Sequence, residues 1–260
     1  MKPETRNCFL KVLPHITRTS LCFVVVLVHI GNLIGLVSVT WSMKESEESV
    51  GSIKEEIERV RALPYTTDPL IATELAGLYL DLGNEIDQDP DQRIAEYKEG
   101  ARVAQNALDL KEDLADAHFY YAANLGSAAY LQGILASLVN LQDLTDHVTR
   151  TLELQEKHAP AHHMRGMMLE ELPWFLGGDS EKALQHLQRA VEIDNYYMHA
   201  RLHLGEAYLD RDRINEAIQE LQFVVLNEPR ESKRKWAKQY RPEAERLLNE
   251  INTEILHASP

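Results

Sequence analysis

Cysteine is almost missing from this 260-residue chain, and its only two cysteines, Cys8 and Cys22, lie near the start. A domain that follows them therefore contains no disulfide and no cysteine-bound metal. Glycine and proline are also few, at 12 and 10 residues, whereas Leu, Ala, Glu and Gln are plentiful. This composition favours helices over a strand-rich sandwich. We therefore expect an all-α fold.

Positive charge is scarce outside the N-terminal region. The first 41 residues carry four basic residues against one acidic residue, although the whole chain has a net charge of -14. Residues 42–260 hold 23 basic and 40 acidic residues, which gives them a net charge of -17. Such a domain repels nucleic-acid phosphates, so we expect no nucleic-acid partner.

The sequence also lacks the usual catalytic motifs. It has no G-x-S-x-G, no phosphate-binding glycine loop followed by Lys-Ser or Lys-Thr, and no H-E-x-x-H. The aspartates from Asp87 onward begin like a calcium loop, but Gln92 replaces the required glycine and Lys98 the bidentate glutamate. We therefore expect no enzyme, no cofactor and no metal site.

Charged residues are absent from Leu21 to Trp41. As a helix this segment would span about 31 Å, which matches the hydrocarbon core of a bilayer. Basic residues precede it and glutamates follow it, so the positive-inside rule places residues 1–20 in the cytoplasm. We predict a transmembrane anchor at 21–41. In a bacterium the protein would be a single-pass inner-membrane protein with its C-terminal domain in the periplasm.

Two alternatives to this topology stay open. The apolar segment could be a cleaved signal peptide, although it is long for one and no A-x-A-like site closes it. In a eukaryotic host the large domain could face the cytosol instead.

A repeated pattern of small and large residues follows the apolar segment. In residues 198–229 it comprises Leu204, Gly205, Tyr208, Ala217, Leu221, Val224 and Pro229. Small residues let two antiparallel helices approach, and large ones fill the space between them. Residues 159–195 repeat the pattern with Gly166, Ala183, Leu187 and Ala190, and residues 115–154 and 70–112 give more divergent copies.

This order of residues resembles the tetratricopeptide repeat. The resemblance implies a solenoid of about four helical hairpins at 69–229, after a linker with a short helix at 42–68 and before a capping helix and tail at 230–260. The stretch LGGDSEKALQHLQRAVEID, the long helix pair and the N-terminal apolar segment resemble one subgroup. That subgroup contains the regulators of microtubule dynamics and the tetratricopeptide subunits of TRAP-type transporters. It implies partner binding and, in some members, a lipid or lipophilic cargo in an apolar cavity.

The first helix of each hairpin lines the concave face of such a solenoid, so residues one turn apart on it form a candidate partner-binding groove. A mixed apolar and acidic groove suits a peptide or helix that brings basic and apolar groups. The predicted groove residues are Glu74, Leu78, Phe119, Ala123, His163, Met167, Leu202 and Glu206.

An apolar insertion at 127–139 is too short to cross a membrane and must be covered by protein or by a ligand. Tyr130, Ile134, Leu135 and Leu138 could wall a lipophilic cavity, or they could pack as ordinary core.

Three further features invite alternative interpretations. Trp174 and Phe175 stand before a glycine pair and could form a lid, a partner anchor or simple packing. His199 and His203 are spaced to share a metal ion, but we find no motif that completes the site, even with His162 and His163 in the preceding repeat. The basic residues from Arg230 to Arg241 could meet anionic lipid or an acidic partner, or form a solvated helix face.

These observations predict a membrane-anchored scaffold for protein–protein interaction, in envelope assembly or transport. The alternative is a protein that binds or transfers lipid or another lipophilic small molecule in the insertion near 127–139.

Overall fold

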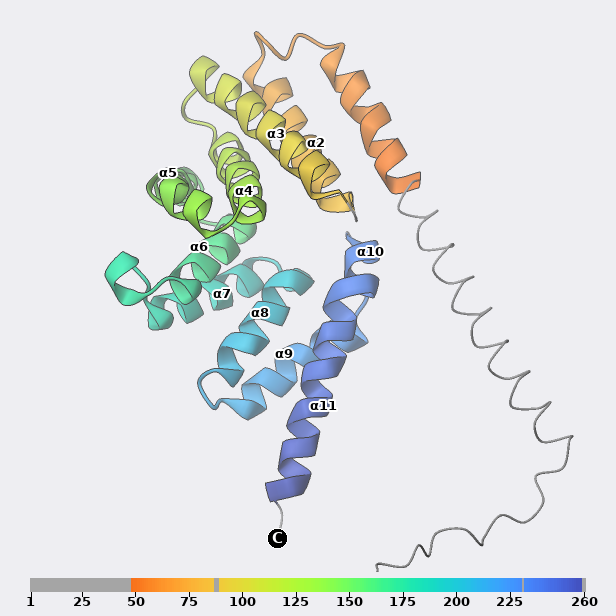
Figure 1. Ribbon diagram of the computed structural model, residues 1–260, viewed down its shortest axis with the longest axis vertical. Helices are drawn as coiled ribbons and strands as arrows, with labels where there is room; N and C mark the ends of the chain where they lie inside the picture. The colour runs from red at the N-terminus through yellow and green to blue at the C-terminus, as the bar shows by residue number, and fades with distance from the viewer. Residues whose placement is uncertain (1–47, 87–88, 231, 259–260) are drawn as a thin grey trace, which may run out of the picture. The chain divides into compact units, whose positions relative to one another are not determined.

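The computed structural model describes residues 48–86, 89–230 and 232–258. Every regular element in these ranges is helical, which confirms the predicted all-α class (Figure 1). None of the helices described is long and apolar enough to cross a membrane. The anchor predicted at 21–41 lies outside the described residues. From Ile53 onward the chain forms one compact unit.

A first helix covers residues 48–61. The helices after it are α2 (Pro69–Glu85), α3 (Pro90–Leu110), α4 (Ala115–Gln132), α5 (Ile134–Leu154), α6 (Ala159–Glu171), α7 (Ser180–Ile193), α8 (Met198–Leu209), α9 (Ile214–Leu226), α10 (Lys233–Lys235) and α11 (Arg241–Ala258). A 3-10 turn, η1 (Trp174–Leu176), precedes α7, and a π-helical turn, η2 (Trp236–Tyr240), joins α10 to α11.

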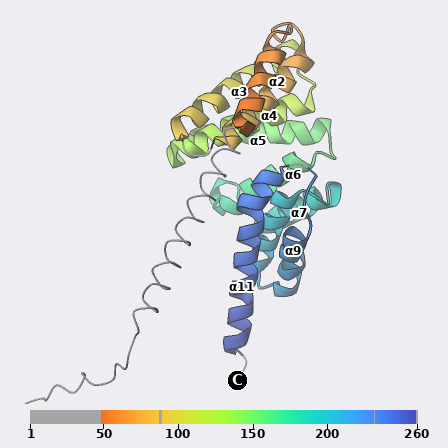
Figure 2. The same ribbon diagram turned by 90° about the vertical axis from the view of Figure 1, so that its right-hand side faces the viewer.

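Helices α2 to α9 form four consecutive hairpins. Within each hairpin the two helices pack together, and α11 covers α9 (Figure 2). The first and second hairpins pack closely through α3 and α4, whereas α5 and α6 meet over a much smaller area. The array therefore has a loosely packed junction between its second and third hairpins.

Side-chain caps fix where several of these helices begin. Asp68 accepts hydrogen bonds from the backbone N–H groups of Leu70 and Ile71, and Asp179 accepts one from Lys182. Proline stands at the first position of α2, where its missing N–H has no consequence. Local sequence therefore sets the residues at which α2 and α7 begin.

Close approach of backbones holds the last two hairpins together. A Cβ on Gly166 would lie 2.8 Å from the Leu187 side chain, and one on Gly205 would lie 2.9 Å from Leu221. Leu187 and Leu221 are fully buried, so each leucine fills the space that its glycine leaves. The sequence pattern predicted these pairs.

The first two hairpins use other contacts. Gly100 of α3 faces the buried Asn124 of α4, whose amide donates hydrogen bonds to the carbonyls of Ala76 and Tyr120. Gly77 of α2 faces Tyr120 of the next hairpin, whereas Gly83 of α2 faces Tyr97 of α3 within the first hairpin. The divergent repeats therefore use small residues both within and between hairpins.

One set of polar contacts, which we call the brace, recurs in three successive hairpins. It centres on a side chain in the first helix of each hairpin, and these side chains are His118, His162 and Arg201. His118 bonds to His147 and to the Glu112 carbonyl, with distances of 2.9 and 2.8 Å. His162 bonds in the same way to His186 and to the Glu156 carbonyl, both at 2.9 Å.

In the last hairpin Arg201 and Glu220 replace the histidine pair, and Arg201 reaches the Asn195 carbonyl at 2.7 Å. Each brace thus ties both helices of a hairpin to the loop before it.

The C-terminal helix also contacts the first hairpin. Arg234 of α10 forms an ion pair with Glu85 at the end of α2, and both side chains are largely buried. Nearby, the Trp236 indole donates to the Val224 carbonyl at 2.7 Å. The basic cluster is therefore not one solvated face, because Arg234 turns inward to close the array.

We expect Gly100→Ala to lower the free energy of unfolding by about 1–3 kcal/mol, because the new Cβ would overpack the interior. It would lie 2.3 Å from the Asn124 side-chain oxygen, in a fully buried site. Urea denaturation followed by circular dichroism measures the change. Gly51→Ala is the control, since no atom lies within 4 Å of that Cβ. Equal stability of both variants would contradict the packing argument.

Candidate functional site

A cavity of about 870 Å³ opens among the hairpins. Side chains from the first, second, third and fourth hairpins line it, and its walls are mostly apolar. It lies where α5 and α6 pack loosely. A cavity of this size could enclose most of a small ligand or a few side chains of a bound segment.

One wall is the corner between α4 and α5. Gly133 joins these helices with φ +103° and ψ 179°, a backbone conformation that is essentially restricted to glycine. The corner brings Tyr130 and Ile134 to the cavity, although both remain about three-quarters exposed. The exposed apolar surface at this corner is a feature of interaction sites.

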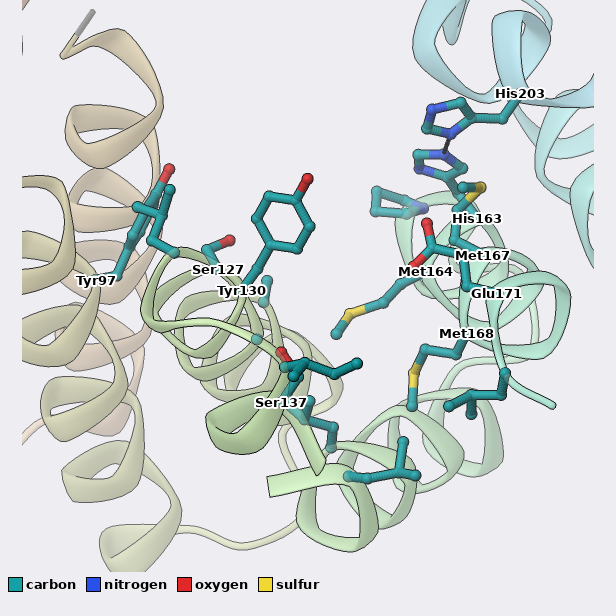
Figure 3. Close-up of a pocket in the computed structure, with 18 of the residues that line it drawn as sticks. Tyr97, Ser127, Tyr130, Ser137, His163, Met164, Met167, Met168, Glu171 and His203 are labelled. Carbon is teal, nitrogen blue, oxygen red and sulfur yellow. Dashed lines mark hydrogen bonds between the residues drawn. The ribbon is translucent and has the colours of Figure 1, made fainter. Parts of the chain in front are cut away.

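The opposite wall is the α6 helix, whose three methionines point toward the cavity (Figure 3). Met164, Met167 and Met168 follow one another along one face of α6. Thioether side chains are flexible and polarizable, so they adapt to ligands of different shape. The cavity wall is therefore apolar and deformable.

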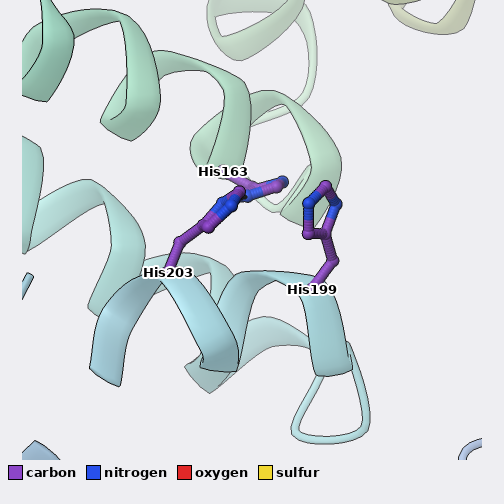
Figure 4. A group of neighbouring side chains, drawn as sticks. All are labelled: His163, His199 and His203. Atoms are coloured by element: carbon purple, nitrogen blue, oxygen red, sulfur yellow. Dashed lines mark hydrogen bonds between the residues drawn. The ribbon is translucent and has the colours of Figure 1, made fainter. Parts of the chain in front are cut away.

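Polar groups gather at the end of the cavity formed by α6 and α8. His163 forms a hydrogen bond with the Tyr197 hydroxyl at 3.0 Å and another with His203 at 2.7 Å. His199 lies against both rings (Figure 4). The ring of His199 also stacks on Tyr240, with ring centroids 4.6 Å apart.

Burial shifts the pKa of the groups at this end. It lowers the pKa of His163 and His199 well below the usual histidine value, and it lowers that of His203 to about 4. Burial also raises the pKa of Glu206 to about 7, with help from Glu243. The three imidazoles are therefore neutral at pH 7.

The structure gathers only part of the predicted groove at this cavity. Phe119, Ala123, His163 and Met167 line it. Leu202 does not, because it is buried in the core among Leu221 and Val224. The other three, Glu74, Leu78 and Glu206, also lie outside the cavity lining. Half of the predicted groove residues therefore lie together at this cavity, and the groove itself stays a prediction.

The predicted insertion cavity coincides with the same opening. Tyr130, Ile134 and Leu138 line it, but Leu135 points away and is 77% exposed. The turn after α6 adds a second exposed apolar site, where Trp174 is 84% exposed and does not pack over the helix pair.

Sequence reasoning missed several lining residues. Tyr97 and Tyr197 reach the cavity from the first and fourth hairpins, which are far apart in the chain. Met164 and Met168 flank the predicted His163 and Met167 on α6, so a wider stripe on that helix would have included them. The sequence analysis also found no third ligand for His199 and His203, whereas the structure places His163 beside them.

Comparison with known proteins agrees with this architecture. Residues 176–237 match a tetratricopeptide-repeat family. A thermophilic TPR protein from Thermus thermophilus is similar over 75% of this chain and 98% of that one, with 14% identity and a TM-score of 0.46. The stacked hairpins and the sequence match together define a tetratricopeptide-type repeat protein.

Residues 41–171, half of the chain, match the family described as regulator of microtubule dynamics protein 1-3. The chain therefore belongs to this family. It is 30% identical to regulator of microtubule dynamics protein 1 of Bos taurus and 29% identical to that of Homo sapiens, over 127 aligned residues in each case. Each alignment covers 43% of this chain and 40% of the relative, so the chain matches about two fifths of those proteins.

We expect acid to destabilise the fold between pH 6.5 and pH 5. Burial lowers the pKa of six described histidines, so the unfolded state binds more protons than the folded state below pH 6.5. They are His147, His162, His163, His186, His199 and His203. Their stabilisation is complete above pH 6.5 and decreases as the pH falls toward 4.

Glu206 acts in the opposite direction, because its raised pKa favours the folded state as the pH falls below 7. The histidines outnumber it, so we expect a net loss on the order of 3 kcal/mol by pH 5. Urea denaturation at pH 8, 7, 6 and 5 measures this loss. His203→Gln should make the dependence on pH shallower, and an unfolding free energy that is constant across this range would refute the argument.

Proposed function

We propose that this protein is a scaffold whose cavity docks an apolar segment of a partner protein, without a catalytic step of its own. The observation that carries the proposal is the apolar opening lined by Phe119, Ala123 and Met167, with exposed apolar side chains at its rim. Tetratricopeptide arrays build extended inner surfaces of this kind, which suit protein partners. The domain's net negative charge favours a partner segment with basic residues beside its apolar ones.

The proposal includes attachment to a membrane through residues 21–41. Their lack of charge and their length support it. The anchor would hold the repeats beside one membrane surface and limit the search for a partner to two dimensions. The charge rule gives a periplasmic repeat domain in a bacterium, with roles in envelope assembly or transport. In a eukaryotic host the alternative is a repeat domain that faces the cytosol.

A photo-crosslinking amino acid at position 130 should capture a protein partner in the native membrane, because Tyr130 lies at the cavity rim. The same substitution at Leu226 is a matched control, since Tyr130 is 77% and Leu226 78% exposed and only Tyr130 lines the cavity. We expect a discrete protein adduct from position 130 alone, and Ala123→Glu should remove it. Identical adducts at both positions would refute cavity-based docking.

A second candidate function is the binding of a lipid or another lipophilic molecule in the same cavity. The volume of about 870 Å³ and the methionine-rich wall favour it. Unlike a docked peptide, such a ligand would stay with the purified chain. The polar end at His163 and Tyr197 would face any headgroup.

Leu138→Asp should lower the amount of lipid that co-purifies with the full chain in mild detergent, because a carboxylate would enter an apolar wall. Leu135→Asp provides the control. It introduces the same charge on the same helix, but Leu135 does not line the cavity. Native mass spectrometry measures retained lipid, and lipid bound to residues 21–41 should be equal in both variants. Equal retention by the two variants would exclude the cavity as a lipid site.

A further inference from the structure

Three histidines from two successive hairpins meet at the polar end of the cavity. His163 comes from α6, and His199 and His203 come from adjacent turns of α8 (Figure 4). One ligand atom from each ring lies within 4.8 Å of those of the other two. None of the three is needed by the hairpin braces, which use His118, His162 and their partners.

The spacing of the three rings suits one small cation. Zinc binds imidazole nitrogen at about 2.0–2.1 Å in tetrahedral geometry, which sets the nitrogens about 3.3 Å apart. The nitrogens of His163 and His203 are 2.7 Å apart, and no pair of ligand atoms exceeds 4.8 Å. The observed separations therefore bracket the required one. Small rotations of the side chains would be enough to bind the ion.

The outer nitrogens of two rings lie near groups that would orient the rings around a bound ion. His163 Nδ1 lies 3.0 Å from the Tyr197 hydroxyl, which can accept its N–H, so that Nε2 carries the lone pair. His203 Nδ1 then donates its N–H to His163 Nε2 at 2.7 Å, and an ion would take the place of this proton. The His203 proton would move to Nε2, which lies 3.9 Å from a carboxylate oxygen of Glu206, so a small side-chain rotation would bring the two into hydrogen-bond distance. Hydroxyl and carboxylate groups commonly orient metal-binding histidines in this way.

The third ring is held by the C-terminal helix. Tyr240 stacks on His199 with an interplanar angle of 11°, and Tyr240 ends the π-helical turn. Turns of this kind are frequent at functional sites. The ring of His199 therefore stands at a fixed angle to the other two.

The charges around the cluster are mixed. All three imidazoles are neutral at pH 7, because burial lowers the pKa of each, so their lone pairs are available. Glu206 lies near His203, and although burial raises the pKa of Glu206 to about 7, a bound cation would favour its ionised form. Lys235 opposes binding, since its positive charge acts on His199, although its own pKa is lowered by burial.

We propose that His163, His199 and His203 bind a divalent transition-metal ion of the Zn²⁺ class, with the fourth coordination position open to the cavity. Three nitrogen donors select such an ion over Mg²⁺ and Ca²⁺, which prefer oxygen ligands. Zinc sites with three protein ligands leave their fourth position to water or to a ligand. The metal site does not depend on whether the cavity docks a protein or a lipid.

Isothermal titration of the untagged full chain with Zn²⁺ at pH 7.5 tests the proposal. We expect the native chain to bind one ion, and His203→Gln or His199→Gln to weaken binding by more than about a hundredfold, because even outer partners contribute about 10- to 100-fold. His186→Gln is the matched control, since it removes a partly buried imidazole from a hairpin brace and leaves the cluster intact. Cys8 and Cys22 are present in every variant, so any Zn²⁺ that these two cysteines bind contributes equally to all the titrations.

Two further measurements separate a loss of ligand from a loss of fold. Tyr197→Phe keeps all three imidazoles and should weaken Zn²⁺ binding by about 10- to 100-fold. Co²⁺ in place of Zn²⁺ should give the intense visible absorption of a tetrahedral site in the native chain, and circular dichroism checks the helices of each variant. The proposal is wrong if folded His203→Gln binds Zn²⁺ as tightly as the native chain, or if His186→Gln weakens binding equally.

Discussion

Close contact between the two helices of each repeat is the constraint on which the rest of the structure depends. Gly166 and Gly205 have no side chain at the contact, so Leu187 and Leu221 fill the space and fix the distance between the helices. Because each hairpin is rigid, the face that it turns inward is fixed too. The cavity is therefore a consequence of how the hairpins stack, and its lining residues did not have to be adjacent in the chain.

Two departures from uniform stacking create the cavity. The second and third hairpins meet over a small area, which leaves space between α4 and α6. At the far side Arg234 pairs with Glu85, so the C-terminal helix joins the first hairpin and limits how far the array can open. The contact between α5 and α6 is thus smaller than the one between α3 and α4. The ion pair between Arg234 and Glu85 adds a contact between the two ends of the array. Together they turn an open groove into a partly enclosed site.

Sequence reasoning predicted the helical class and the last two hairpins, because the glycine, alanine and leucine spacing there is regular. It left a cavity wall and ordinary core packing as alternatives for Tyr130, Ile134 and Leu138, and the structure places these residues in the lining of the cavity. It could not predict which face each residue of that insertion presents. The direction depends on Gly133, whose φ of +103° turns α5 and points Leu135 away.

Contacts between distant repeats were beyond the reach of the sequence pattern. The pairing of His163 with His203 depends on the superhelical rotation between hairpins, and that rotation is a sum of many side-chain contacts. The inward turn of Arg234 has the same origin, because Glu85 lies 149 positions away in the chain. Local spacing determines hairpins well and their mutual rotation poorly.

The recurring polar brace has different chemistry along the array. The second and third hairpins are braced by histidine pairs, whereas the last is braced by an ion pair between Arg201 and Glu220. The two facing ring nitrogens of a histidine pair form one hydrogen bond, so one ring must donate and the other must accept. The hairpin therefore fixes the position of the brace, and the array accepts either a histidine pair or an ion pair at that position.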